Sequence, residues 1–213
     1  MPALSTLIDD FAAGTINTSL WTGNYGTVSQ VGGRARVACT TAYSAFASAA
    51  AYNLAGSSVF IRVFPPAAGG AATSCYATVY VNAGTAGTEA GFSFNALTGR
   101  LRFNANVAYW DDNAVELPYD PVAHAYVRLA EAGGSLTWAT SPDGTAWTTR
   151  RTLATPAWIT SGTTLKLVLE SHRDSGTADY AEFDDCNTLG GSGPGPDPGD
   201  ATAARKAAFL AFL

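Results

Sequence analysis

The chain has 213 residues, of which 47% are hydrophobic and only 14% are charged, and its net charge is −5 at neutral pH. A protein that follows a phosphate backbone needs a basic stripe, so this balance excludes a typical nucleic-acid-binding protein. No segment is apolar for long enough to span a bilayer, and the N-terminus lacks the regions of a secretory signal. We therefore predict no nucleic-acid partner, no membrane insertion and synthesis in the cytoplasm without a signal peptide.

The first hundred residues contain short extended segments separated by turn formers. Residues 27–31 and 34–39 flank Gly32-Gly33 and predict a hairpin, because glycine supplies the positive φ that a tight turn needs. The alanine- and serine-rich residues 43–52 predict a strand or a loop. Further strands are predicted at residues 7–11, 58–64, 74–81, 90–95 and 100–104.

Residues 125–153 have the clearest pattern in the chain. Tyr126, Arg128 and Ala130 alternate with Val127, Leu129 and Glu131, as expected of a strand with two different faces. Gly133-Gly134 forms a first turn, and Ser141-Pro142-Asp143-Gly144 has the residue order of a second. The segment predicts a meander of three antiparallel strands.

The remaining segments complete an all-β pattern. Residues 106–120 are less regular, and a corner follows at 156–158, before strands predicted at 164–171 and 178–186. Strands that recur every eight to twelve residues or so, with turn formers between them, are typical of a β-sandwich or barrel.

Several of these segments resemble a known family. The meander with its aromatic-x-Arg strand, Trp138, Ser-Pro-Asp-Gly and Trp147 is similar to the late meander of concanavalin-like jelly-roll domains of the LamG and glucanase type. Ile8-Asp9-Asp10-Phe11 with Leu20-Trp21 resembles the first strand of that family, and residues 181–185 resemble its last. The resemblance covers residues 7–189 and implies a two-sheet antiparallel jelly roll over residues 1–189, with its two ends side by side.

The C-terminal residues differ in composition from this domain. Residues 190–199 are rich in glycine and proline and predict a linker, and Asp200 is a suitable N-cap for a short helix up to residue 213. We predict that residues 200–213 are an apolar peptide that anchors the domain in a larger assembly; a disordered tail or the start of a further domain are the alternatives. Its predicted partner-binding residues are Phe209, Leu210, Phe212 and Leu213.

The sequence does not predict an enzyme. Glucanases with this fold carry a Glu-x-Asp-x-(x)-Glu pattern on one strand, with one carboxylate as nucleophile and another as acid. The nearest match, Glu182-Phe183-Asp184, has no second glutamate, so the proton donor is missing and a solvated terminal strand explains it better. His124, His172 and Ser141 have no local setting of a catalytic triad. We predict no catalytic residue.

Metal and disulfide signals are weak. Asp111-Asp112-Asn113 resembles calcium-holding loops of this fold family, but calcium needs about six or more oxygen ligands from several segments, so no cofactor is predicted and calcium remains an alternative. Cys39, Cys75 and Cys186 are odd in number and widely spaced. They predict buried thiols, with one long-range disulfide left open and its pair undetermined.

Aromatic residues give the best indication of a binding site, since sugar-binding sandwiches stack exposed rings on sugars beside polar side chains. Trp138 and Trp147, in the meander, are predicted to be core residues. The predicted glycan site is centred on Trp110, and a core or subunit contact there remains open. Its members are Tyr109, Trp110, Asp111, Asp112, Asn113 and Trp158.

The signal-free N-terminus, sparse charge, a composition typical of a GC-rich genome and the apolar tail together suggest a virion protein of a bacteriophage. Lectin-like domains of this family occur in minor tail proteins and head decorations, so the resemblance implies display on the virion surface and attachment to a host glycan. We predict a non-enzymatic adhesin or decoration protein that is oligomeric in the assembly. The alternatives are a structural subunit without a ligand and a secreted bacterial carbohydrate-binding or glucanase-like protein.

Overall fold

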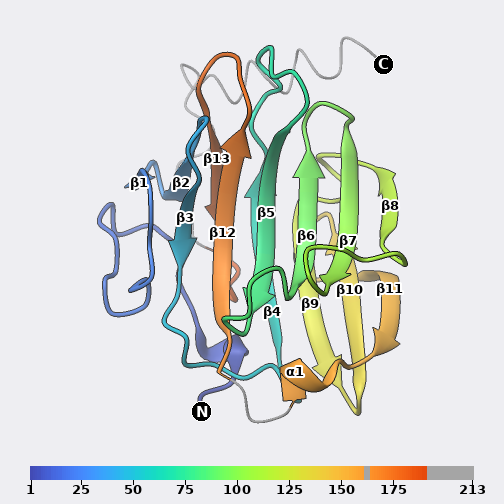
Figure 1. The fold of residues 1–213 in the computed structure, drawn as a ribbon. Helices are drawn as coiled ribbons and strands as arrows, with labels where there is room; N and C mark the ends of the chain where they lie inside the picture. The colour runs from blue at the N-terminus through green and yellow to red at the C-terminus, as the bar shows by residue number, and fades with distance from the viewer. Residues whose placement is uncertain (161–163, 191–213) are drawn as a thin grey trace.

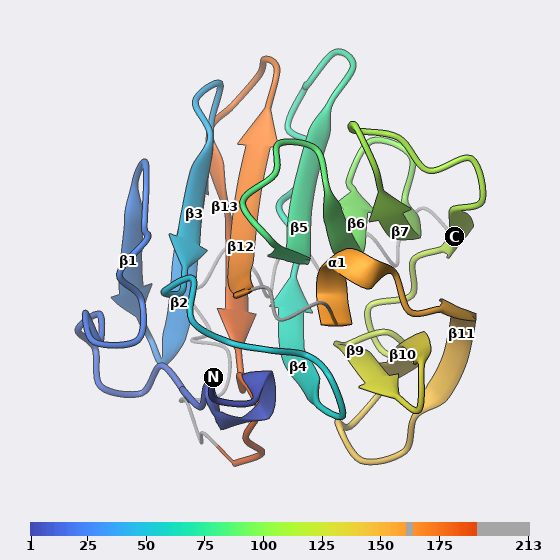
Figure 2. The ribbon, with the colours of Figure 1, turned by 60° about the horizontal axis from the view of Figure 1, so that its bottom comes forward.

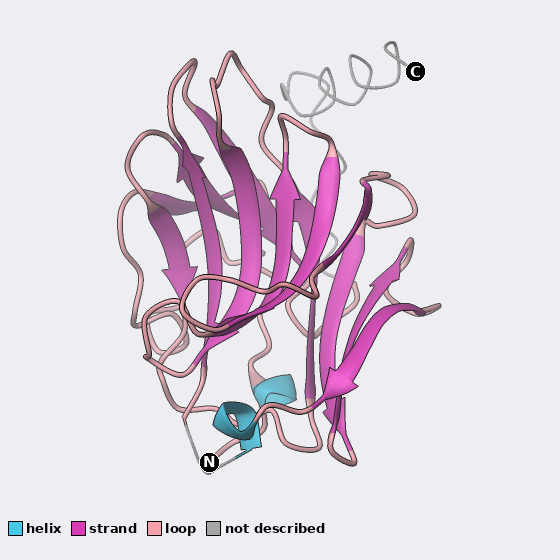
Figure 3. Cartoon of the chain, turned by 45° about the vertical axis from the view of Figure 1, so that its right-hand side comes forward, coloured by secondary structure: helices cyan, strands magenta, loops and turns pink. Residues whose placement is uncertain are grey.

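The computed structural model describes residues 1–160 and 164–190, which form two antiparallel β-sheets packed face to face (Figure 1). Figures 2 and 3 show the two layers from below and from the side. The predicted all-β, two-sheet class is confirmed. The predicted linker from residue 191 onward and the anchoring peptide, with Phe209, Leu210, Phe212 and Leu213, lie outside the described residues.

The seven-stranded sheet has the order β1-β2-β13-β4-β9-β10-β11, and the six-stranded sheet has the order β3-β12-β5-β6-β7-β8. The seven strands are β1 (Val28–Val31), β2 (Arg34–Cys39), β13 (Asp179–Asp184), β4 (Ser58–Phe64), β9 (Tyr126–Ala132), β10 (Ser135–Ser141) and β11 (Thr148–Ala154). The six are β3 (Ser44–Ala47), β12 (Lys166–Arg173), β5 (Cys75–Asn82), β6 (Glu89–Asn95), β7 (Arg100–Asn106) and β8 (Val115–Pro118).

Helical structure in the described part of the chain is confined to a 3-10 turn, η1 (Leu4–Thr6), and one turn of α-helix, α1 (Ala157–Thr160). Neither of these helices is long and apolar enough to cross a membrane.

The local predictions agree with the strands except at two places. The 27–39 hairpin, the 58–64 strand and the three-stranded meander are present as predicted. Residues 7–11 form only an isolated bridge from Asp9 to Cys186 rather than a strand, and the irregular segment 106–120 contains the edge strand β8. Asp9 depends on a partner at the other end of the chain, and β8 depends on the preceding strand β7.

The beginning and end of the domain lie side by side, as the resemblance implied. The amide of Asp9 donates to the Cys186 carbonyl at 3.1 Å, and the Cys186 amide donates to the Asp9 carbonyl at 2.9 Å. A carboxylate oxygen of Asp9 also accepts a hydrogen bond from the Trp21 indole at 2.7 Å, which fixes the buried Trp21 against this closure.

The core lies between the sheets and is filled by alternating strand residues. In β5, Cys75, Ala77, Val79 and Val81 point into the core, so the residues between them point outward from the six-stranded sheet. Trp138 is fully buried, as predicted. The core prediction for Trp147 is wrong, because its ring lies on the outer face of the seven-stranded sheet.

Trp147 contacts two side chains of that outer face. Its ring centroid lies 5.8 Å from the Phe60 ring and 4.5 Å from the Arg128 guanidinium carbon. The tryptophan comes just before β11. In β11 the buried residue is Arg151, so the core contact expected of Trp147 is made by this arginine. Strand periodicity alone predicts a two-faced strand but not which of its two faces meets the core.

Candidate ligand-binding groove

A groove of about 450 Å³ crosses the outer face of the six-stranded sheet, the face turned toward the viewer in Figure 1. It is formed mainly by outward-facing side chains of neighbouring strands and by three loops, which contribute Tyr43, Gly87 and Tyr109. Its lining combines aromatic rings with amide, hydroxyl and carboxylate groups, which is the mixture expected of a pocket that binds a small polar ligand. We call it the groove; its lining residues are Tyr43, Tyr76, Thr78, Tyr80, Asn82, Gly87, Glu89, Phe92, Ser93, Arg102, Asn104, Asn106, Tyr109 and Glu170.

Glu170 lies on the floor of the groove and is held by tyrosines. Its Oε2 accepts hydrogen bonds from the Tyr25 hydroxyl and, at 3.3 Å, from the Tyr80 hydroxyl. Burial raises the pKa of the Glu170 carboxyl, and the two tyrosine hydrogen bonds act in the opposite direction. The same burial raises the pKa of both tyrosines, so their hydroxyls remain donors.

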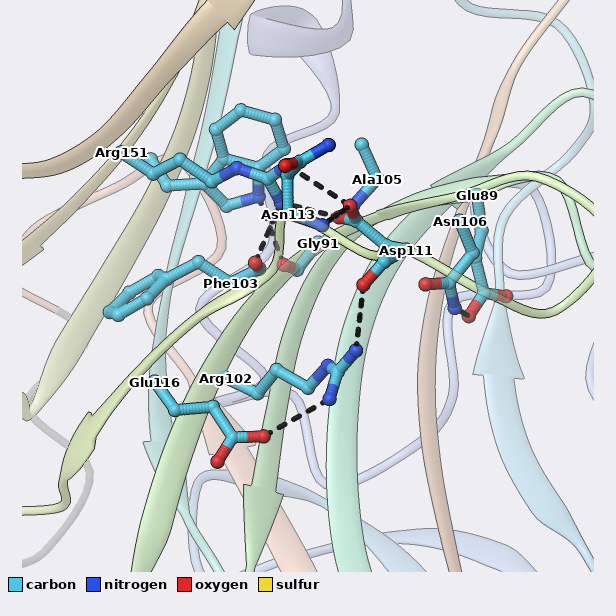
Figure 4. A network of polar contacts seen from close by, with 11 residues as sticks. Glu89, Gly91, Arg102, Phe103, Ala105, Asn106, Asp111, Asn113, Glu116 and Arg151 are labelled. Carbon is cyan, nitrogen blue, oxygen red and sulfur yellow. Dashed lines mark hydrogen bonds and ion pairs between the residues drawn. The ribbon is translucent and has the colours of Figure 1, made fainter.

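Glu89 supplies a second carboxylate on the same face. Asn106 donates a hydrogen bond to its Oε1 at 3.1 Å (Figure 4). Burial is the main cause of the raised pKa of Glu89, and the negative charge of Glu170 adds to it. Glu89 pairs with Asn82 of β5 whereas Glu170 pairs with Thr78, so the two glutamates occupy different levels of the groove.

Stacked rings extend the groove toward β3. The His172 imidazole stacks on the Tyr43 ring at 4.0 Å with an interplanar angle of 13°, and it also contacts the Tyr76 ring at 5.7 Å. The hydroxyls of Tyr43 and Tyr76 lie 3.3 Å apart. This arrangement gives a rigid aromatic surface with hydroxyl groups at its edge.

The wall opposite consists of the loop between β7 and β8. Tyr109 lies there with φ of +71°, a conformation that is unusual for a bulky residue, and its side chain remains 72% exposed. Its amide donates to the Gly87 carbonyl at 2.9 Å. A Cβ on Gly87 would lie 2.5 Å from the Tyr109 nitrogen, so only glycine allows this approach. Strained backbone of this kind is found preferentially at functional sites.

A buried ion pair fixes this loop to the other sheet (Figure 4). Arg151 of β11 donates to an Asp111 carboxylate oxygen at 2.6 Å and to the Phe103 carbonyl at 2.8 Å. The two side chains are 7% and 6% exposed, and the Ala105 amide also donates to Asp111. These bonds lower the pKa of Asp111 despite its burial. Asp111 therefore positions the loop, and its carboxylate is already occupied by partners.

The structure brings only part of the predicted glycan site together. Tyr109 lines the groove, and the exposed Trp110 lies beside it, with its ring 5.6 Å from the Arg102 guanidinium carbon. The Trp110 indole donates to Asp112 at 2.6 Å. The Asn113 amide donates to Asp111 at 3.0 Å, as in a local turn.

Trp158 is separate from these residues. It lies in α1 and packs partly buried against the core, at the end of the sandwich shown at the bottom of Figure 1. Its neighbours are core side chains, so the structure places it away from the groove lining.

The alternative of a calcium site at residues 111–113 is also disfavoured, because the carboxylate of Asp111 is already paired. A guanidinium lies 2.6 Å from an Asp111 oxygen and opposes a cation at that carboxylate. Among the described residues, no three side chains of the His, Cys, Asp and Glu types are grouped so that they could hold a metal.

Glu182 and Asp184 lie on the opposite side of the molecule from the groove, on the outer face of the seven-stranded sheet. The interpretation of a solvated strand is wrong, because both side chains are buried under arginines. Glu182 forms ion pairs with Arg34 at 3.0 Å and Arg36 at 2.6 Å.

Asp184 should make the free energy of unfolding depend on pH. Burial, together with the adjacent charge of Asp185, raises the pKa of Asp184 to about 7. Between its ordinary pKa near 3.8 and pH 7 the folded state holds a proton that the unfolded state releases, so stability falls as pH rises. We expect the free energy of unfolding of the wild type to fall by about 2–4 kcal/mol between about pH 4 and pH 8 because of this group. The Asp184→Asn protein should not show this fall, and urea unfolding at each pH measures the difference. Parallel profiles for the two proteins would contradict this assignment.

Most residues of the groove were not predicted from the sequence. The alternation of Tyr76, Thr78 and Tyr80 with buried residues was visible, and tyrosines on the polar side of a strand were the available signal. Glu89 and Glu170 could not be recognised, because the pairing of β12 with β5 joins segments about ninety residues apart.

Comparison with known proteins identifies the fold. No family model matches the sequence, and no curated protein is significantly similar to it. The structure matches a β-glucanase of Bacillus licheniformis with a TM-score of 0.62 and 16% identity over 84% of this chain and 95% of that one. A laminarinase of Flavobacterium sp. UMI-01 matches with a TM-score of 0.61 and 8% identity, and the catalytic domain of an endo-1,3-β-glucanase of Thermotoga petrophila with 0.59 and 12%. Each of these two matches covers 84% of this chain. The match includes 96% of the Flavobacterium chain and 94% of the Thermotoga chain.

The fold is the concanavalin-like jelly roll of glucanases. Identities of this size are evidence for the fold alone, because one jelly roll serves many functions. The two carboxylates that line the groove, Glu89 and Glu170, lie on different strands, β6 and β12.

Proposed function

We propose that the chain is a non-enzymatic saccharide-binding module and that its groove holds a glycan. The observation that carries the proposal is the groove itself, which combines the rings of Tyr43, Tyr76 and Tyr109 with amide groups on one open face. Sugar rings present apolar CH faces and peripheral hydroxyls, and aromatic rings with amides and carboxylates complement both. The half-buried carboxylates of Glu89 and Glu170 make an anionic ligand unfavourable.

Tyr109→Ala should weaken glycan binding by roughly tenfold or more, because it removes an exposed ring from the wall of the groove. Binding is measured by calorimetry with soluble laminarin, mixed-linkage β-glucan, xylan and mannan, and with polygalacturonate as the anionic probe. Tyr180→Ala is the matched control, since this exposed tyrosine lies on the other sheet. Trp110→Ala tests the residue on which the sequence prediction was centred.

The proposal predicts binding of at least one neutral polysaccharide, no binding of polygalacturonate and an unchanged affinity for the Tyr180→Ala variant. Absence of binding to the whole panel, or equal affinities for the Tyr109→Ala variant and the wild type, would contradict it.

Glycoside hydrolysis is a second candidate, because two carboxylates with raised pKa share the groove. A protonated glutamate can act as an acid, and an ionised one can act as a base or nucleophile. Against it, Glu170 already accepts hydrogen bonds from two tyrosines, and the two glutamates come from different strands and different levels of the sheet. Release of reducing ends from a bound polysaccharide, abolished in both Glu89→Gln and Glu170→Gln variants, would establish hydrolysis instead of binding alone.

We further propose that the module is displayed on a phage virion, through residues 200–213. This part rests on the sparse charge and the apolar C-terminal sequence. Particles that carry a chain truncated after residue 199 should lose the module while the truncated protein still binds its glycan. Normal incorporation of the truncated chain would contradict the anchoring role.

A further inference from the structure

Two cysteines meet where strand ends of the two sheets lie next to each other. Cys39 is the last residue of β2, and Cys75 is the first residue of β5. Their sulfur atoms are 3.8 Å apart, and both residues are fully buried. The third cysteine, Cys186, lies elsewhere, with its thiol directed at the Leu7 carbonyl at 3.5 Å.

The backbone at this junction is fixed by hydrogen bonds. Arg173, the last residue of β12, pairs with Cys75 in the six-stranded sheet. Its amide donates to the carbonyl of Thr40, the residue after Cys39, at 2.9 Å. Strands β2 and β5 therefore approach each other to within 8 Å between Cα atoms. The sulfur atoms of a disulfide are about 2.05 Å apart, so the two sulfurs, 3.8 Å apart here, must approach each other by less than about 2 Å to form the bond.

The Arg173 side chain makes this a charged site. Its guanidinium, 1% exposed, donates to the Cys75 sulfur at 3.1 Å and to the Cys39 sulfur at 3.5 Å. The hydrogen bond from Cys75 and the adjacent positive charge lower the pKa of Cys39, whereas the pKa of Cys75 is raised. The two sulfurs share a hydrogen bond beside a positive charge, which favours a thiolate at one of them, and a thiolate is the reactive form of cysteine.

We propose that Cys39 and Cys75 are a peroxide-sensitive pair that closes to a disulfide and joins the two sheets. The Cys39 thiolate attacks one oxygen of hydrogen peroxide; an S–O bond forms, the O–O bond breaks, and the departing hydroxide takes a proton to become water. The Cys75 sulfur then attacks the sulfenic sulfur; the S–S bond forms, the S–O bond breaks, and the second hydroxide leaves as water with the Cys75 proton. Two thiols are oxidised, and one peroxide is reduced to two waters.

Burial determines which oxidant fits. Cys75 also contacts the Ala67 carbonyl at 3.4 Å, and the loop after β4 lies over Arg173, where a Cβ on Gly69 would be 2.6 Å from a guanidinium nitrogen. Because both thiols are enclosed, a small peroxide molecule fits this site better than a bulky disulfide reagent. The bond would close a loop between residues 36 positions apart, so oxidation should raise the melting temperature by roughly 5–15 °C.

The test treats the purified full-length protein with hydrogen peroxide and combines intact mass, peptide mapping without reduction and thermal melting. The proposal predicts a mass lower by two hydrogen atoms, a peptide pair joined through Cys39 and Cys75, and a melting temperature that returns to its original value on reduction. The Cys186→Ser protein should behave like the wild type. Cys75→Ser and Cys39→Ser proteins, which each retain Cys186, should form no intramolecular bridge and show no reversible shift.

Several outcomes would overturn the proposal. They are an unchanged mass, oxygen adducts without a bridge, a bridge that includes Cys186, or the same reversible shift in the Cys75→Ser protein. None of these measurements depends on glycan binding, so this inference and the proposed function succeed or fail separately.

Discussion

Replacing Trp138 with alanine is expected to lower the free energy of unfolding by about 3–5 kcal/mol. Its side chain is fully buried, and its indole nitrogen donates to the Gly91 carbonyl at 2.9 Å. Trp138 belongs to β10 and Gly91 belongs to β6, so this one residue packs and hydrogen-bonds across the two sheets. Alanine leaves a large cavity and a buried carbonyl without its donor.

Urea unfolding followed by circular dichroism measures this effect. Trp110→Ala is the matched control, because Trp110 is 64% exposed and its loss should change stability by no more than about 0.5 kcal/mol. Trp138→Phe keeps most of the packing and loses the hydrogen bond, so we expect an intermediate loss of about 1–3 kcal/mol. Equal effects of Trp138→Ala and Trp110→Ala would contradict the assignment of Trp138 as the link between the sheets.

Arg151→Met is expected to cost a similar amount, about 3–5 kcal/mol, because it leaves the Asp111 carboxylate buried without its cationic partner. The Phe103 carbonyl loses a donor in the same variant. The guanidinium also lies over the Trp138 ring, with its carbon 4.9 Å from the ring centroid, a contact that methionine only partly replaces. The loop that carries Tyr109 should lose its attachment to β11, so glycan affinity is expected to fall together with stability.

The control is Arg100→Met, which removes an exposed arginine 3.9 Å from Glu116 and should cost less than about 1 kcal/mol. The double variant Asp111→Asn with Arg151→Met should recover part of the loss, because no charge is then buried alone. If the single and double variants are equally unstable, packing of the arginine stem rather than the ion pair is responsible.

Local sequence was sufficient for the elements whose information is local. Gly32-Gly33 and Gly133-Gly134 mark hairpins because the turn conformation is decided by a few adjacent residues. The N-terminal segment around Asp9 and the edge strand β8 were not predicted correctly, since what they form depends on partners such as Cys186 and β7. Strand periodicity also left open which side of a strand is buried, and this explains the incorrect prediction for Trp147.

Of the groove and its surroundings, only the exposed residues Tyr109 and Trp110 were predicted from the sequence. Tyr109 and Trp110 were identified because exposed aromatic residues in an irregular, polar segment are recognisable without a structure. The roles of Asp111 and Glu182 depended on arginines distant in sequence, and those arginines make both carboxylates structural. A carboxylate in a sequence does not indicate whether its charge will be neutralised by a partner or face a ligand.

The sequence by itself determined the all-β class and the positions of most strands along the chain, because periodicity and turn chemistry act over a few residues. The meeting of the two ends of the domain was expected only from the resemblance to a known family. Only the tertiary structure decided that Glu89, Glu170 and the tyrosines share one groove, and that Cys39 lies beside Cys75 rather than Cys186. Those neighbours come from strands far apart in the chain. Their contacts arise from the register and packing of whole sheets, which no local pattern specifies.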